Sequence, residues 1–302
     1  MSEFDPFEEA EHNLNTINEI LFGGAAPDDL GERVSFLSGS GFCMVVRVEV
    51  APGQFRVVKY GGEPQADMLN REFQSLSILA NTETVRVPQD LAMGETESGQ
   101  TFLVMEFLPG ATPEPEYWPN LARDLATLHA LTDADGFGFE YNNYLGSLPQ
   151  LNARYKTPAQ FICENRLLPL AGQALYQDLI TKHQYEGLLG ICQRMPDLLP
   201  NERPALVHGD FWSGNIVADN KGRATLIDPA IHMGIREADI AMSLLFGGLD
   251  DSFYEAYHEV FPMEPGWKGR MPLYQLYPIL AHILLFGESY VSLLDKAVAK
   301  FK

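Results

Sequence analysis

The sequence predicts an α+β protein of two lobes, with an antiparallel β-sheet and one main helix in the N-terminal lobe and a mostly helical C-terminal lobe. The first observation is a series of short runs rich in β-branched and apolar residues before residue 61, with glycines in the intervening turns. The second is a change after residue 119, where leucines recur at helical spacing. A strand-rich segment followed by a helix-rich one predicts lobes over residues 1–108 and 109–302.

The elements of the N-terminal lobe follow from β-type runs, turn residues and one helical run. Gly39, Ser40 and Gly41 separate the first two strands, and Pro52 with Gly53 marks the next turn. Leucine and phenylalanine then recur at helical spacing, which predicts an amphipathic helix against the sheet. The elements expected in chain order are a helix over 7–22, strands over 34–37, 43–50 and 55–60, a helix over 66–80 and a strand over 101–108.

The C-terminal lobe is expected to follow the Pro109–Gly110 pair. Leu121, Leu125 and Leu128 mark its first helix. Most later segments have helical patterns, and the strand-like exceptions are short runs over 205–207 and 224–227.

The composition argues against two classes of partner. With 41 acidic and 21 basic residues the formal charge is -20, which repels phosphate backbones and anionic membranes over most of the molecule. Nucleic acid and membrane surfaces are therefore not expected as partners. A nucleotide such as ATP is compatible with this charge, because a bound Mg²⁺ and a few cationic side chains set the local field of a site.

Cysteine spacing and apolar segments predict the compartment. Cys43, Cys163 and Cys192 lie far apart without a C-x-x-C pair, which fits neither a disulfide framework nor a zinc site. The first ten residues lack the basic region of a signal peptide, and Pro278 and His282 interrupt the longest apolar stretch. We therefore expect a cytoplasmic protein, with Cys43 either a small buried strand residue or a redox-sensitive thiol.

The stretch from Val207 to Asn215 carries the strongest chemical signal. Asp210 and Asn215 have four residues between them, and Asp228 follows a strand-like run further along. Kinase catalytic loops place an Asp and an Asn at this spacing, with a metal-binding Asp beyond them. The pattern indicates Asp210 beside an acceptor hydroxyl, with Asn215 and Asp228 as oxygen ligands of Mg²⁺. The alternative is that these residues are ordinary turn formers.

Lys59, near the end of the third expected strand, is a candidate phosphate ligand. Glu72 on the following helix is placed to hold its ammonium group, as the Lys–Glu pair does in kinases. Glu63 and Asp67 are competing partners, and the alternative for Lys59 is a solvated edge residue. The turn at 39–41 is able to cover phosphates with backbone N–H groups, a pattern that is common by itself.

Several ordered motifs together carry a family resemblance. They are His208-Gly-Asp-Phe-Trp-Ser-Gly-Asn215, Ile227-Asp-Pro-Ala230, the group Arg236, Glu237, Asp239, Ala241 and Met242, then Leu245-Phe-Gly-Gly248, with further matches at Asn143, Gln150, Asn152 and Leu273-Tyr-Gln-Leu-Tyr277. Over nearly the whole chain the sequence resembles the fructosamine kinase family, relatives of the aminoglycoside phosphotransferases within the protein-kinase-like superfamily.

The resemblance implies a protein-kinase-like two-lobed fold, ATP and Mg²⁺ as cofactors, and a set of residue roles. Asp239 is expected to brace the catalytic loop. From its position two residues before Asp210, His208 is expected to be a structural histidine that fixes this loop, the alternative being a general base on its own. The other implied roles are Asp210 as catalytic base, Asn215 and Asp228 as Mg²⁺ ligands, Lys59 as phosphate-binding lysine with Glu72 as its partner, and the backbone of Glu106, Phe107 and Leu108 as the adenine contact.

The family also implies the acceptor, a ketoamine, which is a sugar joined to an amine or to a lysine side chain and phosphorylated on a sugar hydroxyl. Trp212 is either a packing residue or a flat surface for the sugar ring beside Asp210. Two other functions stay open: phosphorylation of an aminoglycoside-like or choline-like alcohol, and nucleotide binding without turnover. The complete set of phosphotransfer residues argues against the last. The sequence does not specify an oligomeric state.

Overall fold

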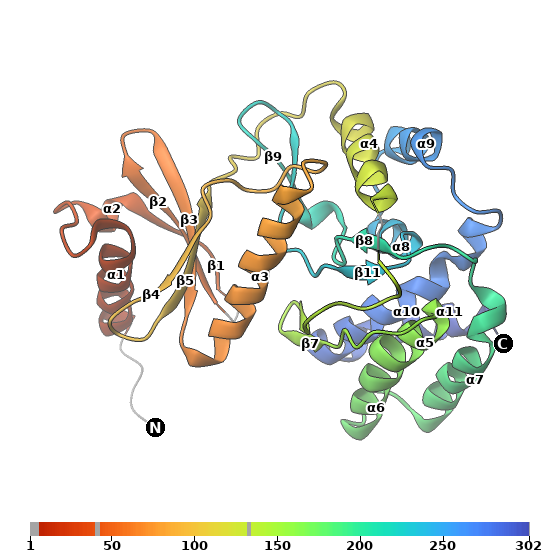
Figure 1. The fold of residues 1–302 in the computed structure, drawn as a ribbon. Coiled ribbons are helices and arrows are strands. Elements are labelled where there is room, and N and C mark those ends of the chain that lie inside the picture. The colour runs from red at the N-terminus through yellow and green to blue at the C-terminus, as the bar shows by residue number, and fades with distance from the viewer. Residues whose placement is uncertain (1–5, 40–42, 132–133, 302) are drawn as a thin grey trace. The chain divides into compact units, whose positions relative to one another are not determined.

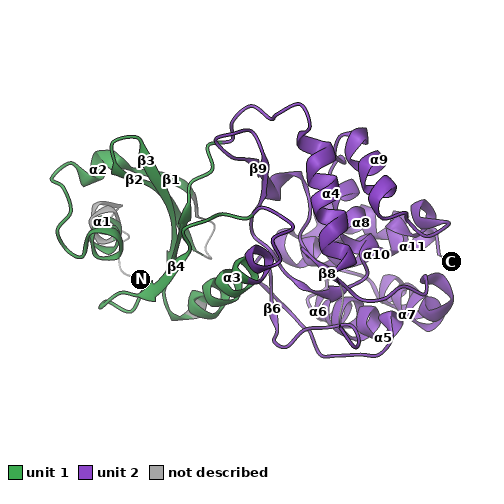
Figure 2. Cartoon of the chain, turned by 45° about the horizontal axis from the view of Figure 1, so that its top comes forward, with its two compact units in different colours: residues 1–77, 87–109 green, residues 78–86, 110–302 purple. Residues whose placement is uncertain are grey.

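The chain divides into two compact units within the residues that the computed structural model describes, which are 6–39, 43–131 and 134–301. The first unit comprises residues up to 77 together with 87–109, and the second comprises the remainder (Figure 2). An antiparallel sheet in the first unit and a mainly helical second unit agree with the predicted fold class. Residues 78–86 group with the helical unit. The lobe limits at 108 and 109 stay a prediction.

The first unit is built on an antiparallel sheet, whose described strands are ordered β1-β2-β3-β5-β4 (Figure 1). Each element predicted for this lobe is present. The sequence does not signal β4, because its Ala-Met-Gly-Glu run lacks β-branched residues. The elements are α1 (Pro6–Phe22), α2 (Leu30–Arg33), β1 (Val34–Gly39), β2 (Met44–Ala51), β3 (Gln54–Gly61), α3 (Glu63–Asn81), β4 (Ala92–Glu95) and β5 (Thr101–Glu106).

Alternation along the strands gives the sheet two different faces. Val46 and Val48 of β2 and Val58 of β3 are buried in one apolar cluster with Ile17 of α1. Lys59 is the next residue along β3 and faces the other side, where α3 lies (Figure 1). Each buried aliphatic side chain contributes about 1.5–3 kcal/mol. This burial fixes the strand register, since a shift of one residue would turn Lys59 toward α1.

The second unit combines helices with short strand pairs. Its helices are α4 (Tyr117–Ala130), α5 (Pro158–Phe161), the π-helix η1 (Ile162–Leu167), α6 (Leu168–Tyr176), α7 (Lys182–Leu198), the 3₁₀ helix η2 (Ser213–Asn215), α8 (Glu237–Leu245), α9 (Asp251–Val260), α10 (Trp267–Phe286), the 3₁₀ helix η3 (Glu288–Tyr290) and α11 (Val291–Ala299). Its pairs are β6 (Asn143–Leu145) with β7 (Leu148–Gln150), β8 (Ala205–Val207) with β11 (His232–Gly234), and β9 (Ile216–Ala218) with β10 (Ala224–Leu226).

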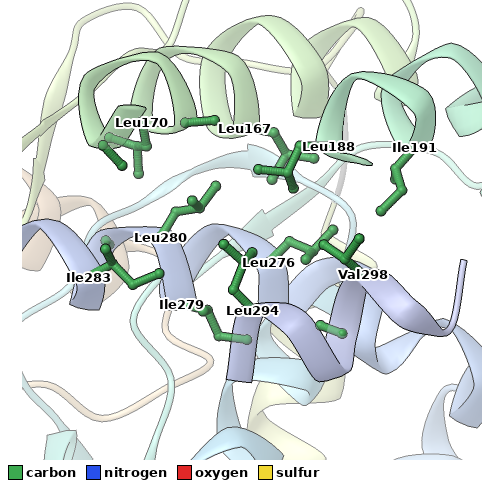
Figure 3. Packing of buried hydrophobic residues seen from close by; sticks show 14 of the residues in the cluster. Leu167, Leu170, Leu188, Ile191, Leu276, Ile279, Leu280, Ile283, Leu294 and Val298 are labelled. Atoms are coloured by element: carbon green, nitrogen blue, oxygen red, sulfur yellow. The ribbon is translucent and has the colours of Figure 1, made fainter. Parts of the chain in front are cut away.

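One hydrophobic core of the helical unit lies between η1, α6, α7, α10 and α11 (Figure 3). It includes Leu167, Leu170, Leu188, Ile191, Leu276, Ile279, Leu280, Ile283, Leu294 and Val298. Helix α10 ends at Phe286, and its C-cap residue Gly287 has a φ of 82°, which few other residues adopt. Because Leu276, Ile279, Leu280 and Ile283 belong to this core, the core anchors the C-terminal half of α10. Among the described residues, no helix has both the length and the hydropathy needed to cross a membrane.

Candidate active site

Lys59 and Glu72 form an ion pair inside the first unit. Lys59 Nζ lies 2.6 Å from Glu72 Oε1, and the two side chains are only 14% and 17% exposed. The register places Lys59 between Val45 of β2 and Leu103 of β5, while the middle of α3 carries Glu72. A pair shielded in this way holds the ammonium group more firmly than a surface pair does.

The acidic residues that compete for Lys59 have other surroundings. Asp67 Oδ1 lies 3.3 Å from Arg71 Nε on the same helix. Glu63 is exposed in the first turn of α3. The geometry therefore supports Glu72 as the partner of Lys59.

The glycine turn is described only at its edge. Gly39 ends β1 and pairs with Met44 of β2. Ser40 and Gly41 lie outside the described residues. The proposed contact of this turn with phosphates stays a prediction.

The connector after β5 is described in full. The carboxylate of Glu106 accepts a hydrogen bond from the backbone N–H of Gln89 at 3.0 Å. Phe107 packs against Phe55 with ring centroids 5.7 Å apart, and Leu108 is half-buried. These contacts fix the side chains of the connector, and an adenine contact by its backbone stays a prediction.

Short strand pairs in the second unit shape the loop from His208 to Asn215. Val207 of β8 pairs with His232 of β11, and the backbone N–H of Ala230 donates to His208 O at 2.9 Å. Gly209 has a φ of 84°, and a Cβ at this position would clash with the carbonyl oxygen of Ala230. Glycine alone therefore permits this crossing of the two chain segments.

Asp239, in the first turn of α8, braces the loop as the sequence predicts. Its carboxylate accepts the backbone N–H groups of His208 at 2.7 Å and Gly209 at 2.9 Å. It also lies 3.1 Å from Nε2 of buried His129. Burial by itself raises the pKa of Asp239, but these hydrogen bonds and the nearby histidines hold that pKa below its ordinary value. Asp239 is therefore an ionised anchor for the loop backbone.

His208 has a structural place in the same loop. Its Nδ1 accepts a hydrogen bond from the backbone N–H of Asp210 at 3.3 Å. Burial lowers the pKa of His208, although the charges of Asp239 and Asp228 oppose this effect. A buried neutral ring bonded to the loop backbone fixes the loop, as predicted.

Asp210 and Asn215 are joined through their side chains. Asn215 Nδ2 donates to Asp210 Oδ2 at 2.8 Å and to its backbone oxygen at 3.0 Å. Burial raises the pKa of Asp210 to about 7; hydrogen bonds from Asn215 and Trp212 oppose the rise, and the charges of Asp228 and Asp239 add to it. The residue keeps a partly exposed surface. Such a carboxylate is able to accept a proton near neutral pH.

Trp212 packs against neighbouring residues and keeps part of its surface open, and its contact with a sugar stays a prediction. Its ring meets Phe246 edge-on, with centroids 5.5 Å apart, and lies against Gly214, where a Cβ would collide with the indole. The side chain is nevertheless only half-buried. Trp212 is therefore packed on one side and open on another, close to Asp210.

Asp228 lies two residues after the end of β10, in an uncommon backbone conformation. Its φ is 53°, in the left-handed region that aspartate tolerates better than most residues. Such strain outside glycine is concentrated at functional sites. The residue is exposed, so its carboxylate is accessible to ligands.

The oxygen atoms of Asn215 and Asp228 suit Mg²⁺. Because the amide nitrogen of Asn215 donates to Asp210, its amide oxygen points elsewhere and is the atom that suits a metal. Mg²⁺ takes oxygen ligands and is bound through one or two carboxylates together with substrate phosphates and water. In the described part of the chain, no group of three or more His, Cys, Asp or Glu side chains forms a complete metal site. The donor set fits a metal shared with a nucleotide.

Sequence reasoning missed a buried polar network behind the segment that follows β10. Gln150 Nε2 donates to Asn143 Oδ1 at 2.8 Å and to Ala230 O at 3.0 Å. Asn152 Nδ2 donates to Asn143 Oδ1 at 2.8 Å, and Arg166 Nη2 donates to Asn152 Oδ1 at 2.8 Å. The resemblance includes the first three side chains without a role. The fold gives them one, because they tie the 229–232 segment to η1.

A cavity of about 50 Å³ lies behind the catalytic loop. Gly209 and Asp239 line it together with mainly apolar side chains such as Leu273, whereas Asp210 is not part of its wall.

The chain also matches known proteins. The model of the fructosamine kinase family matches residues 43–302. The chain belongs to the fructosamine kinase family. A probable ketoamine kinase of Enterococcus faecium is 41% identical over 220 residues, which cover 72% of this chain and 77% of that protein.

Solved structures place this fructosamine kinase family member in the protein-kinase-like fold. A Haemophilus somnus protein assigned as a fructosamine-3-kinase has a TM-score of 0.82 and 26% identity, covering 97% of this chain and 98% of that one. An aminoglycoside phosphotransferase in a ternary complex with ADP and hygromycin B has a TM-score of 0.64 at 17% identity, covering 95% and 97%. The second likeness concerns the fold alone.

In this fructosamine kinase family member the predicted site residues form two sets, one in the first compact unit and one in the second. Lys59 pairs with Glu72 in the first unit. Asp210 bonds Asn215 in the second, where the charge of Asp228 acts on Asp210. Their chemical roles stay predictions, for which the experiments below are designed.

Proposed function

We propose that this protein is an ATP-dependent kinase that phosphorylates a sugar hydroxyl of a ketoamine. The observation that carries this proposal is the family match, since residues 43–302 include all of the predicted phosphotransfer residues. These residues are Lys59, Glu72, Asp210, Asn215 and Asp228. The Enterococcus faecium relative is itself named as a ketoamine kinase.

The proposed reaction assigns one task to each of these residues. The acceptor hydroxyl gives its proton to Asp210, its oxygen bonds to the γ-phosphorus, and the bond from that phosphorus to the β–γ bridging oxygen breaks to release ADP. The raised pKa of Asp210, about 7, suits this transfer near neutral pH. Asn215 and Asp228 would hold Mg²⁺, which when bound neutralises charge on the β- and γ-phosphates. Lys59, held by Glu72, would contact the phosphates.

An acceptor panel tests the proposal. ADP release is measured with ATP, Mg²⁺ and one acceptor at a time: a fructosyl-lysine derivative, a ribulosyl amine, an aminoglycoside and choline. We expect release with the ketoamines. Release only with choline or the aminoglycoside would reject the ketoamine acceptor and leave phosphotransfer standing. Nucleotide binding without release for any acceptor would favour a protein that binds nucleotide without turnover.

Lys59→Met is expected to lower kcat/KM roughly 10- to 100-fold and to reduce catalysis more than it reduces folding stability. The methionine fills the volume of the mostly buried lysine stem but removes the ammonium charge that is proposed to contact the phosphates. Glu72→Gln should give a milder form of the same defect, since the lysine stays but loses its anchor. Steady-state kinetics and thermal unfolding of the same preparations separate the two effects.

Glu63→Gln is the matched control for Glu72→Gln, because it removes one carboxylate from the exposed first turn of the same helix. It should leave activity unchanged. If Glu63→Gln or Asp67→Asn is more damaging than Glu72→Gln, then Glu72 is not the functional partner of Lys59.

Trp212→Ala is expected to raise the acceptor KM by roughly tenfold, or about 1.4 kcal/mol, with little change in the KM for ATP. The half-buried indole lies beside Asp210, so its face is placed to cover the apolar side of a sugar ring. Trp212→Phe keeps a ring and should recover most of the affinity. Equal effects of Trp212→Ala on both KM values would show that the ring shapes the whole loop and not the acceptor site.

A further inference from the structure

Aromatic rings continue in an unbroken series from Trp212. Phe246, directly after α8, has its ring centroid 5.5 Å from that of Trp212 and 4.7 Å from that of His282. His282, in turn, lies 5.4 Å from Phe286 and 5.0 Å from Tyr290. We call Phe246, His282, Phe286 and Tyr290 the aromatic strip. It links the catalytic loop to the end of α10.

The strip is open to solvent although rigid elements hold it. Phe246, His282 and Tyr290 are half-buried, and Phe286 is 61% exposed. His282 and Phe286 occupy the last turns of α10, whose C-terminal half a hydrophobic core of the helical unit anchors, and Tyr290 ends η3. A single exposed ring is unremarkable, but a series of rings continuous with a catalytic loop is a ready contact surface. Rigid aromatic rings bind ligands with little loss of side-chain entropy.

His282 adds one hydrogen-bond acceptor to the strip. Its Nδ1 lies 2.7 Å from the backbone oxygen of Pro278, and a carbonyl oxygen only accepts, so Nδ1 carries the proton. Burial lowers the pKa of His282, and the ring is therefore neutral at neutral pH. In this tautomer Nε2 is the acceptor. An ammonium N–H is a suitable donor to it.

The charges around the strip favour a cation. Residues 237–267 and 271–295, which carry all four rings, contain no lysine or arginine, and Glu288 is exposed between Phe286 and Tyr290. Aromatic faces attract ammonium groups within about 6 Å. A ketoamine contains such a group, because its secondary amine is basic and is protonated at neutral pH. The charge of the acceptor and the charge of the surface are thus complementary.

We infer that the aromatic strip binds the amine half of the ketoamine acceptor. With the sugar beside Asp210 and Trp212, the ammonium nitrogen lies near His282, and the carbon chain of the amine packs on Phe286 and Tyr290. The inference rests on the proposed function and narrows its range of acceptors. Preferred acceptors carry an alkyl or aromatic group on the amine, as a glycated lysine side chain does. A glycated methylamine lacks the contact with Phe286 and Tyr290.

Two acceptors that differ only in the amine group test the inference. Phe286→Ala should raise the KM for fructosyl-benzylamine about fivefold, while the KM for fructosyl-methylamine stays within about twofold and kcat is unchanged for both. Phe286→Tyr keeps the ring and should restore the wild-type KM. Tyr176→Ala, which removes a tyrosine 89% exposed at the end of α6, is the matched control and should change neither KM.

The outcomes separate the inference from the proposed function. If the wild-type protein phosphorylates both acceptors but Phe286→Ala changes both KM values equally or neither of them, the subsite is overturned and the ketoamine kinase stands. If the wild-type protein phosphorylates no ketoamine, the proposed function fails and the subsite fails with it. A KM increase confined to the benzyl acceptor and reversed by Phe286→Tyr supports the subsite.

Discussion

Asp210→Asn is expected to lower turnover by about 10²- to 10⁴-fold and to leave ATP affinity nearly unchanged. Asparagine has the shape of aspartate, and its carbonyl oxygen still accepts the hydrogen bond from Asn215, so the loop geometry is kept. An amide, however, does not take up the proton of the acceptor hydroxyl. ADP release at saturating ketoamine measures turnover, and calorimetry measures ATP affinity. Turnover near that of the wild type would assign the base to another group.

Thermal unfolding provides the control for Asp210→Asn. Burial raises the pKa of Asp210 from 3.8 to about 7, so its ionised form is less favourable in the folded than in the unfolded chain. In the wild type, protonated Asp210 contributes fully to the free energy of unfolding below pH 3.8. This contribution is lost as the pH rises through about 7. In metal-free buffer, the free energy of unfolding of the variant should therefore rise relative to that of the wild type as the pH increases from about 5 to about 8. A variant that is less stable than the wild type at about pH 5 and also at about pH 8 would indicate that the substitution damages the fold.

Asp228→Ala is expected to abolish Mg²⁺-dependent turnover. The change removes the one carboxylate of the proposed metal site, and without the metal the charge between the β- and γ-phosphates is not neutralised. The Asn215 amide alone is a weak ligand, so Mg²⁺-dependent ATP binding should fall as well. Calorimetric titration with ATP in the presence and absence of Mg²⁺ measures this directly. Unchanged Mg²⁺-dependent binding together with retained activity would mean that another residue holds the metal.

The backbone at residue 228 calls for a separate control, because alanine is strained at positive φ. Asp178 has a φ of 57°, close to the 53° of Asp228, and is an exposed residue just beyond α6. Asp178→Ala therefore imposes a similar conformational cost with no metal role. It should lower the melting temperature about as much as Asp228→Ala does while leaving turnover intact. Loss of turnover in both variants would attribute the effect to backbone strain.

Local patterns predicted much of the fold and the main chemical groups. Alternating β-type runs and turn glycines predicted β1, β2 and β3, since each strand carries its own signal. The spacing of Asp210 and Asn215 predicted that both belong to one kinase-like catalytic loop, and the hydrogen bond between their side chains is a finding of the structure. The short edge strand β4 was not predictable, as its sequence lacks β-type residues and its pairing with β5 supplies its conformation.

The partner of Lys59 illustrates the limit of local patterns. Glu63, Asp67 and Glu72 all lie on α3, and helical spacing alone does not say which of them faces the sheet. The packing of α3 on β3 decides this, and it places Glu72 Oε1 2.6 Å from Lys59 Nζ. The choice depends on how the helix is rotated, which is a property of tertiary packing.

By itself, the sequence determined the fold class, the main elements of the N-terminal lobe, the catalytic motif and the family, because these depend on residue types at short fixed spacings. The tertiary structure alone decided the network that joins Asn143 to Arg166 and the aromatic strip. Their members are far apart in the chain. Contacts of that kind arise only when the core of the helical unit fixes the positions of helices such as α8 and α10, since no local preference encodes the distance between two helices.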